Sequence, residues 1–254
     1  MKISSIKKSN LFYSIIGISF FILIWHLISL NYKPIILPSP IETFKTLFKM
    51  LLEKETWGNI FFSFIRLVIG YSLSLFFGVI IGILMGLNEK INKMINPIVV
   101  FLQTTPNISW ILLAIIWFGL NYKIVVFTIF ISIVPIIIIN TREGIHSTEK
   151  NLLDMARVYN LSKKRKILNI YFPTIRPYVI SAGIITIERA WKIGAMAELL
   201  SLETGIGAGL YWARNNLETE KIFAWTLILV LAGFLSSKLI KIIFNKNLKK
   251  AESN

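Results

Sequence analysis

Apolar runs close to the length needed to cross a lipid bilayer recur along this chain of 254 residues. A membrane-spanning helix needs about 20 predominantly apolar residues, because each residue advances the helix by about 1.5 Å. The runs extend from one end of the chain to the other, which indicates an all-α membrane protein with a single transmembrane domain over residues 1–254. We expect six spans, at approximately residues 11–30, 60–87, 95–120, 124–140, 178–200 and 222–244.

The basic residues indicate how these spans are oriented. The chain has 28 Lys and Arg against 13 Asp and Glu, a formal net charge of +15. In a chain this apolar, cytoplasmic loops held against an anionic membrane face explain that excess better than a nucleic-acid partner does. With six spans, the lysines of both termini, Lys90, Lys93 and residues 147–177 fall on one side. We therefore expect a multi-pass protein of the plasma (inner) membrane, in contact with lipid, with both termini cytoplasmic.

Small residues recur at every fourth position of the second predicted span. In lipid, helices associate through close van der Waals contact, and small side chains allow the backbones to approach. The stripe therefore predicts a packing face for another helix in preference to a ligand-lined groove. It consists of Gly70, Ser74, Gly78, Gly82 and Gly86.

Polar side chains interrupt the third predicted span in the segment QTTPNIS, which starts at Gln103. Pro106 removes one helical hydrogen bond, and the polar neighbours can satisfy the backbone groups that it frees. Polar groups at mid-membrane depth are expected to face protein or water. We therefore take Gln103, Thr105 and Asn107 as candidates for a translocation pathway, with a purely structural bend as the alternative.

Ionisable side chains lie inside two other predicted spans. The fifth contains Glu188, Arg189 and Lys192, and the four-residue separation of Glu188 and Lys192 favours a pair on one helix face. The second contains Arg66, which could extend to the interface or face a water-filled pathway. Charged groups are costly in a bilayer, so these four side chains are also pathway candidates. The alternative for the fifth-span charges is a wetted cytoplasmic vestibule.

The longest polar interval of the chain, residues 147–177, has the pattern of two short amphipathic helices joined by a tight bend. Apolar residues recur at intervals of three and four over residues 148–159, and a second helix is expected over residues 162–170. Asn160 lies between them, and Asn is one of the few residues that tolerate a left-handed conformation. An amphipathic, basic element of this kind suggests a docking surface for a partner.

Several kinds of catalytic chemistry find no support in the sequence. The chain contains no cysteine and no GxxxxGK[ST] phosphate loop, and its two histidines do not have metal-ligand spacing. We therefore expect neither a cofactor nor enzymatic activity. A transport function would need energy from a separate subunit.

The segment from Asp154 to Pro173 resembles the EAA loop of the permease subunits of ATP-binding-cassette (ABC) importers. That loop reads Glu-Ala-Ala, three residues, Gly, nine residues, then Ile-x-Leu-Pro. Here Asp154, Met155 and Ala156 occupy the first three positions, Asn160 that of the glycine, and IYFP the end. Asp keeps the carboxylate and Asn keeps access to the left-handed turn. The segments ILPSPIETF, WILLAIIWFGL, AWKIGAMAELL and GIGAGLYWARN are similar to those of nitrate, sulfonate and taurine permeases.

The resemblance implies a type I importer fold in which cytoplasmic coupling helices contact an ATPase. The implied partners are two copies of the ABC ATPase, a second permease, with a homodimer expected, and an extracytoplasmic solute-binding protein. The implied solute is a small anion, with a thiamine-precursor or flavin-type metabolite as the alternative solute. An alternative function of another class is a non-transporting membrane anchor subunit of a multi-protein complex. The residues implied in coupling are Asp154, Met155, Ala156, Asn160, Ile170 and Pro173.

Overall fold

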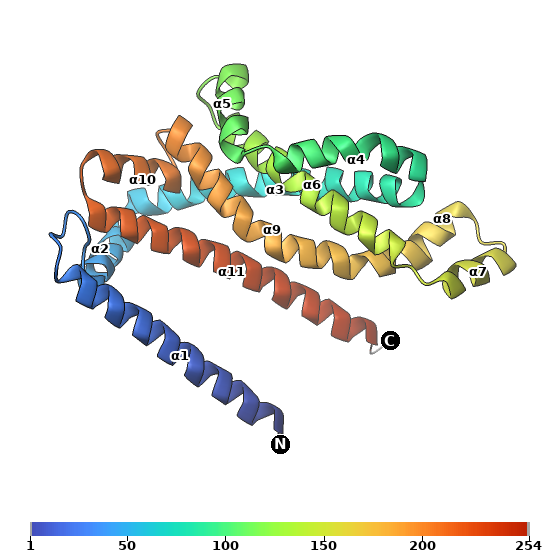
Figure 1. Ribbon diagram of the computed structural model, residues 1–254, viewed down its shortest axis with the longest axis horizontal. Helices are drawn as coiled ribbons and strands as arrows, with labels where there is room; N and C mark the ends of the chain where they lie inside the picture. The colour runs from blue at the N-terminus through green and yellow to red at the C-terminus, as the bar shows by residue number, and fades with distance from the viewer. Residues whose placement is uncertain (1, 253–254) are drawn as a thin grey trace. The chain divides into compact units, whose positions relative to one another are not determined.

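The computed structural model describes the backbone of residues 2–252 and the side chains of residues 12–162 and 164–242. Side chains of the terminal lysines used in the orientation argument lie outside that set. All regular elements in the described part of the chain are helices (Figure 1). They are α1 (Lys2–Ser29), α2 (Pro40–Leu52), α3 (Lys54–Leu87), α4 (Glu89–Thr104), α5 (Asn107–Phe118), α6 (Lys123–His146), α7 (Lys150–Val158), α8 (Lys163–Lys166), a π-helical turn (Ile167–Tyr171), α9 (Phe172–Ser201), α10 (Ile206–Asn215) and α11 (Thr219–Glu252).

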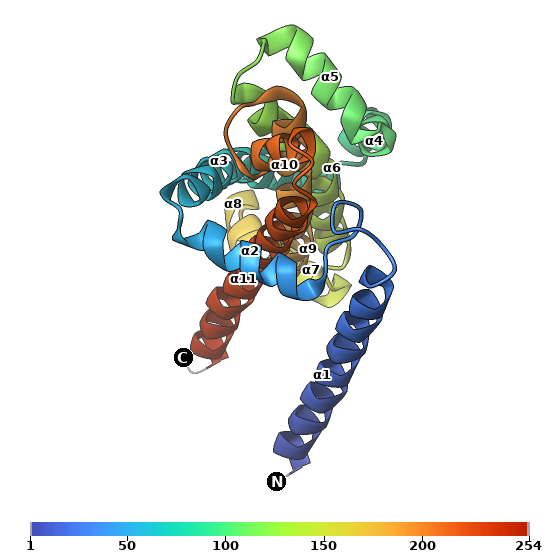
Figure 2. The ribbon, with the colours of Figure 1, turned by 90° about the vertical axis from the view of Figure 1, so that its left-hand side faces the viewer.

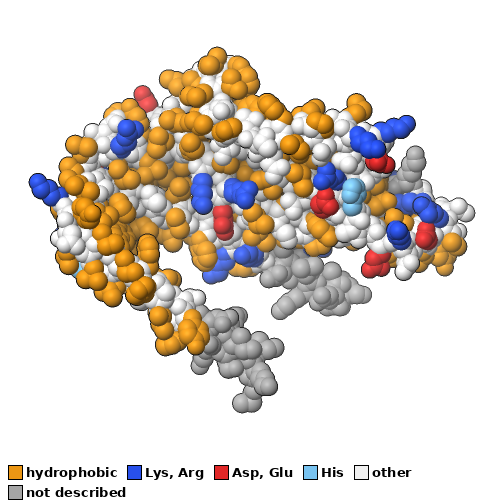
Figure 3. All heavy atoms as spheres, viewed as in Figure 1, with side chains coloured by type: hydrophobic (Ala, Val, Ile, Leu, Met, Phe, Trp, Pro, Cys, Tyr) orange, Lys and Arg blue, Asp and Glu red, His pale blue; other side chains and the backbone are white. Residues whose placement is uncertain are grey.

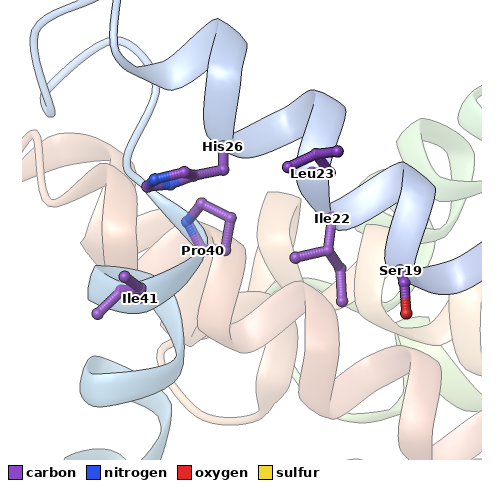
Figure 4. A pocket seen from close by; sticks show the side chains of 6 residues that line it. All are labelled: Ser19, Ile22, Leu23, His26, Pro40 and Ile41. Atoms are coloured by element: carbon purple, nitrogen blue, oxygen red, sulfur yellow. The ribbon is translucent and has the colours of Figure 1, made fainter.

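The chain divides into two compact units. The first comprises Met1–Gly58 with Gly209–Ile228, and the second comprises Asn59–Ala208 with Leu229–Asn254. In the first unit the indole N–H of Trp25 donates to the carbonyl of Pro38 at 3.1 Å, and Trp25 stacks on Phe223. An apolar groove lies between α1 and α2, with the His26 ring beside Pro40 (Figure 4). The groove has almost no polar lining, so it is not a candidate for solute binding.

Five helical segments in the described part of the chain are long and apolar enough to cross a membrane. These are Phe12–Ser29, Lys54–Leu87, Lys123–His146, Lys164–Ser201 and Thr219–Ile242. The helices α4 and α5 pass the same test when taken together, and they are bent by 96° across the short break that contains Pro106 (Figure 2). Counting this bent pair as one span gives six.

The bend between α4 and α5 follows from local chemistry. Proline lacks the N–H that would continue the helix, so carbonyls of the last turn of α4 lose their partners. The Thr105 hydroxyl donates to the Phe101 carbonyl at 2.7 Å, and the Thr104 hydroxyl donates to the Val100 carbonyl at 2.9 Å. The Phe101 carbonyl also accepts from the Thr105 N–H at 3.1 Å, so these hydroxyls reinforce the last turn of α4, and the expectation that polar neighbours satisfy the groups freed by Pro106 stays a prediction.

The stripe of small residues on α3 packs against α6. A methyl group added to Gly78 would lie 2.7 Å from a side-chain carbon of Ile137, and one added to Gly82 would lie 2.6 Å from Cβ of Thr141. One turn before Gly78, the Ser74 hydroxyl donates to the Gly70 carbonyl at 2.8 Å and lies 3.3 Å from the Phe130 carbonyl of α6. Distances this short leave no room for a side chain, so the predicted packing face is confirmed and its partner is α6.

The helix α6 also packs against α9, and Ile129 contacts both neighbours. A methyl group on Gly144 would lie 3.1 Å from Cα of Ile175, and one on Gly194 would lie 3.2 Å from Ile129. Ile129 and Ile133 of α6 are fully buried. The helix α6 is thus enclosed by α3 and α9, and it forms the core of the second unit.

Residues 147–177 form one docking element that differs in one respect from the expected pair of helices. Asn160 has φ 49°, so the left-handed bend is confirmed. The second helix was expected to end near Ile170, but α8 continues through the π-helical turn into α9. Pro173 lies in the first turn of α9, where a missing N–H costs little, and so it begins that helix instead of ending the one before.

Substitution at the α3–α6 contact tests this packing. We expect Gly82→Leu to destabilise the protein by about 1–3 kcal/mol, because the added side chain overlaps Thr141 and the Ile138 carbonyl. Gly58→Leu is the matched control on the same helix, since nothing lies within 4 Å of a methyl group there. Thermal unfolding in detergent measures both. Equal midpoints for the two variants would contradict the assigned packing.

Candidate functional site

A cavity of about 340 Å³ lies in the second unit among α4, α5, α6 and α9. Its polar lining consists of Gln103, Asn107, Ser132, Arg189 and Lys192, and the remainder is isoleucine from α6 and α9. Four of the seven side chains proposed for a pathway therefore meet at one place. Ser132 was not among the candidates; a single hydroxyl in an apolar run gives no sequence signal.

The bend and the helical repeat explain why these side chains converge. Gln103 lies in the last turn of α4 and Asn107 is the first residue of α5, so the break between the helices brings both amides to the cavity. Arg189 and Lys192 are three residues apart, which places them on one face of α9. Thr105 does not line the cavity, because its hydroxyl is used within the bend.

The cavity carries uncompensated positive charge. Among the described residues, neither Arg189 nor Lys192 forms an ion pair, and no carboxylate lines the cavity. The expected pair of Glu188 and Lys192 does not form. Glu188 is exposed next to Gly233 of α11, while Lys192 extends towards the cavity. A cleft with two cations and amide and hydroxyl groups attracts anions and can hydrogen-bond them.

Arg66 lies apart from this cavity, in a buried ion pair. Its guanidinium donates to the Glu198 carboxylate at 2.8 Å, and the relative exposures of the two residues are 8% and 0%. The same carboxylate accepts a hydrogen bond from the Ser63 hydroxyl at 2.7 Å and one from the Gly207 N–H at 3.1 Å. The sequence showed Glu198 inside a span, but it gave no indication of its partner, which is 132 residues away.

This ion pair organises the turn between α9 and α10. Arg66 also donates to the carbonyl and the hydroxyl of Thr204, each at 2.7 Å. Gly205 has φ 115°, and a methyl group there would lie 2.4 Å from the Glu198 carboxylate. Gly205 and Gly207 of the GIGAG segment thus allow the backbone to fold directly onto Glu198, whereas Gly209 faces the Trp225 ring.

Removing one member of the pair should cost more than removing both. We expect Glu198→Leu to destabilise the protein by about 3–5 kcal/mol, because it leaves the Arg66 charge buried without a partner. The double variant Arg66→Met with Glu198→Leu should regain most of that loss, since no buried charge remains. Chemical unfolding of the four proteins of this double-mutant cycle provides the measurement. Additive losses would show that the two charges act independently.

Residues in the positions of the EAA loop divide between two faces of the docking element. Ala156 is fully buried and Ile170 is 7% exposed, so both hold the element against the helices beneath it. Met155 is 50% exposed. The Asp154 carboxylate accepts from Arg157 at 2.8 Å on the exposed surface. Pro173 is also exposed.

An outward apolar patch accompanies this surface. Val158 and Tyr159 are 78% and 73% exposed, and with Met155 they present apolar area near the end of α7. On the face shown in Figure 3, charged side chains gather around the end that carries α7 and α8. Apolar side chains ringed by charge are typical of a surface that contacts another protein.

Known permeases are similar to this chain over most of its length. The putative aliphatic sulfonates transport permease protein SsuC of Bacillus subtilis (strain 168) is 27% identical over 214 residues, which cover 84% of this chain and 78% of that protein. The nitrate import permease protein NrtB of Synechococcus elongatus is 30% identical over 211 residues, which cover 79% of this chain and 76% of that protein.

Comparison with solved structures and with families agrees with these relatives. A chain of a bacterial ABC transporter involved in the import of the acidic polysaccharide alginate superposes with a TM-score of 0.62 at 16% identity, covering 96% of this chain and 98% of that one. The expected type I importer permease fold is confirmed. Residues 74–250 match the family described as binding-protein-dependent transport system inner membrane component, and this chain belongs to that family: it is an ABC-importer permease subunit and not an enzyme.

Proposed function

We propose that this chain forms the translocation pathway for a small anion. The observation that carries the proposal is the cavity in which Arg189 and Lys192 face amide and hydroxyl groups without a carboxylate among the described lining residues. A positive cleft of this kind raises the local concentration of anions. We assign the pathway to Gln103, Asn107, Arg189 and Lys192.

The remaining pathway candidates have other roles in this proposal. Arg66 is fixed by Glu198 and Thr204, and Thr105 is used in the bend, so both are structural. Glu188 is exposed beside Gly233 of α11 and does not line the cavity, so it takes no part in the proposed pathway.

The relatives support an anion as the solute. Those reported above are named for aliphatic sulfonates and nitrate, which are both oxyanions. Two cations disfavour a cationic thiamine precursor, and no aromatic side chain lines the cavity for stacking on a flavin-type ring. The relatives are named as transport permeases, which does not favour a non-transporting anchor subunit.

The proposed assembly places residues 1–254 as one transmembrane domain with both termini in the cytoplasm. In this orientation α7 is cytoplasmic, as the positive-inside bias supports. Two copies of the chain would form the pathway, two copies of an ABC ATPase would drive it, and an extracytoplasmic binding protein would deliver the solute. Most described side chains of α1 are exposed and apolar, and the face that carries them would lie in lipid.

The docking element around α7 would couple the ATPase to the pathway. Met155, Val158 and Tyr159 provide the apolar contact with the ATPase, and Asp154 with Arg157 provides its charged rim. Ala156 and Ile170 hold the element against the helices beneath it, while Asn160 forms its bend and Pro173 lies at the start of α9. ATP binding can switch access only to the extent that it stabilises one arrangement of this contact over another.

Neutralising the cavity tests the proposed solute class. We expect Arg189→Gln with Lys192→Gln to lower uptake of nitrate and methanesulfonate by proteoliposomes about tenfold or more, equivalent to at least ~1.4 kcal/mol of lost stabilisation. Lys123→Gln, at the exposed start of α6, is the control for net charge. Undiminished uptake by the double variant would exclude this cavity as an anion pathway.

Placing a charge in the apolar patch of α7 tests the coupling contact. We expect Met155→Asp to weaken ATPase binding by about 2 kcal/mol or more, roughly thirtyfold, because a carboxylate would have to be desolvated in the contact. Its unfolding midpoint should stay close to that of the wild type, since Met155 is half exposed. Lys164→Ala is the control on the neighbouring exposed surface. Co-purification with the ATPase at increasing salt measures the effect, and full retention by Met155→Asp would contradict the assignment.

A further inference from the structure

Arg142 of α6 makes a polar contact with α4 that lies outside both the cavity and the exposed surface of α7. Its guanidinium donates to the Asn96 side-chain carbonyl at 2.9 Å and to that of Asn92 at 3.3 Å. It also donates to the Glu143 carboxylate at 2.8 Å and 3.2 Å. The Arg142 side chain is 17% exposed. One side chain of α6 therefore holds two consecutive turns of α4.

The rest of the α4–α6 contact is apolar. Val99 of α4 is 1% exposed and packs with Val134 and Ile138 of α6, and Ile91 and Ile95 extend the contact along α4. Apolar contacts are non-directional, so they specify helix register less sharply than hydrogen bonds do. Hydrogen bonds from a planar guanidinium depend on distance and angle. Arg142 is thus the contact that fixes the register of α4 on α6.

Arg142 lies where the docking element joins the membrane helices. It is one turn from the end of α6, and the next residues lead directly into α7: the Ser147 N–H donates to the Glu143 carbonyl at 2.9 Å. The close approach of Gly144 to Ile175 holds the ends of α6 and α9 together. A displacement of α7 would therefore move α6 and α9 as a pair.

The other end of α4 lies at the cavity. Gln103 is in its last turn, and Asn107 follows the break. The helix α4 is joined to α3 by a single residue, Asn88, and Val99 packs with Met85 of α3 as well as with α6, so Arg142 supplies the polar contact that ties α4 to α6 in addition to α3.

We infer that Arg142 is a positioning residue for coupling: by holding Asn92 and Asn96 it makes α4 move with α6, so that displacement of α7 carries Gln103 and Asn107 at the cavity. This inference rests on the proposed function of α7 and of the cavity. If Arg142 only added stability, α4 would not need to keep its position relative to α6 when nucleotide binds. The position of α4 relative to α6, with and without nucleotide, therefore distinguishes a coupling role from a purely stabilising one.

The absence of cysteine from the chain allows a direct test by spin labelling. Labels are placed at Ile98→Cys on α4 and His146→Cys at the end of α6, both exposed positions. Labelled chain is mixed with excess unlabelled chain, so that each dimer carries one labelled copy. The complex with its ATPase and binding protein is reconstituted in nanodiscs, and label distances are measured without nucleotide and after trapping with ATP and vanadate.

The expected result is one narrow distance distribution that is the same in both states for the wild-type background. In Asn96→Leu and in Arg142→Met the mean should differ between the states by at least the ~1–2 Å typical of helix shifts, or the distribution should broaden. Asn96→Asp keeps an acceptor for Arg142 and should behave as the wild type. Lys93→Gln, which removes an exposed ion pair on α4, is the control.

The outcomes separate this inference from the proposed function. A wild-type distance that changes between the states, or Asn96→Leu and Arg142→Met distributions that match the wild type, would overturn the role of Arg142. Cross-linking of Met155→Cys to the ATPase is measured in parallel. If Met155→Cys cross-links to the ATPase but the distances contradict the role of Arg142, only the inference is rejected. If no cross-link forms in the assembled complex, the coupling role of α7 is rejected.

Discussion

The close contact of α6 with both α3 and α9 is the interaction on which the rest of the second unit depends. Glycines at Gly78 and Gly82 of α3, and Gly144 of α6, bring the helices to distances at which no side chain fits. In lipid this contact has no hydrophobic drive, so stability must come from dispersion between many closely packed atoms. Two of these helices, α6 and α9, also line the cavity and adjoin the docking element.

Two groups of charges in this unit illustrate how environment decides the role of a side chain. Arg66 and Glu198 are both buried. Arg66 donates to Glu198 and Thr204, and Glu198 also accepts from Ser63 and Gly207, so the two act together as a fixed structural pair. Arg189 and Lys192 have no such partners and border a cavity. Removing water from a charge is costly, and an unpaired charge is retained only where water or a solute can reach it. This contrast separates the structural arginine from the cations available to a solute.

The sequence was informative wherever a pattern is local. The stripe on α3, the break at Pro106 and the bend at Asn160 each follow from residues within a few turns of one another, and the structure has all three. Contacts between distant segments were beyond reach: Glu198 lies 132 residues from Arg66, and no periodicity links them. The local rule also failed for Glu188 and Lys192, because favourable spacing on a helix is worth only about 0.2–0.5 kcal/mol and neighbouring helices outweigh it. In this chain, local spacing therefore predicted elements, while tertiary contacts decided the partners of charged groups.

The position of the bend between α4 and α5 gives a physical reason for a cavity at that level of the membrane. A continuous helix would satisfy its backbone and could present only side chains to its neighbours, whereas a break aims the end of one helix and the start of another at the same point. The hydroxyls of Thr104 and Thr105 donate to carbonyls of the last turns of α4, so these two side chains are used within the break. The amides of Gln103 and Asn107 remain available to a solute, because other groups already hold the backbone in place. In the proposed pathway, a site built in this way would exchange its solute without unfolding the helix that carries it.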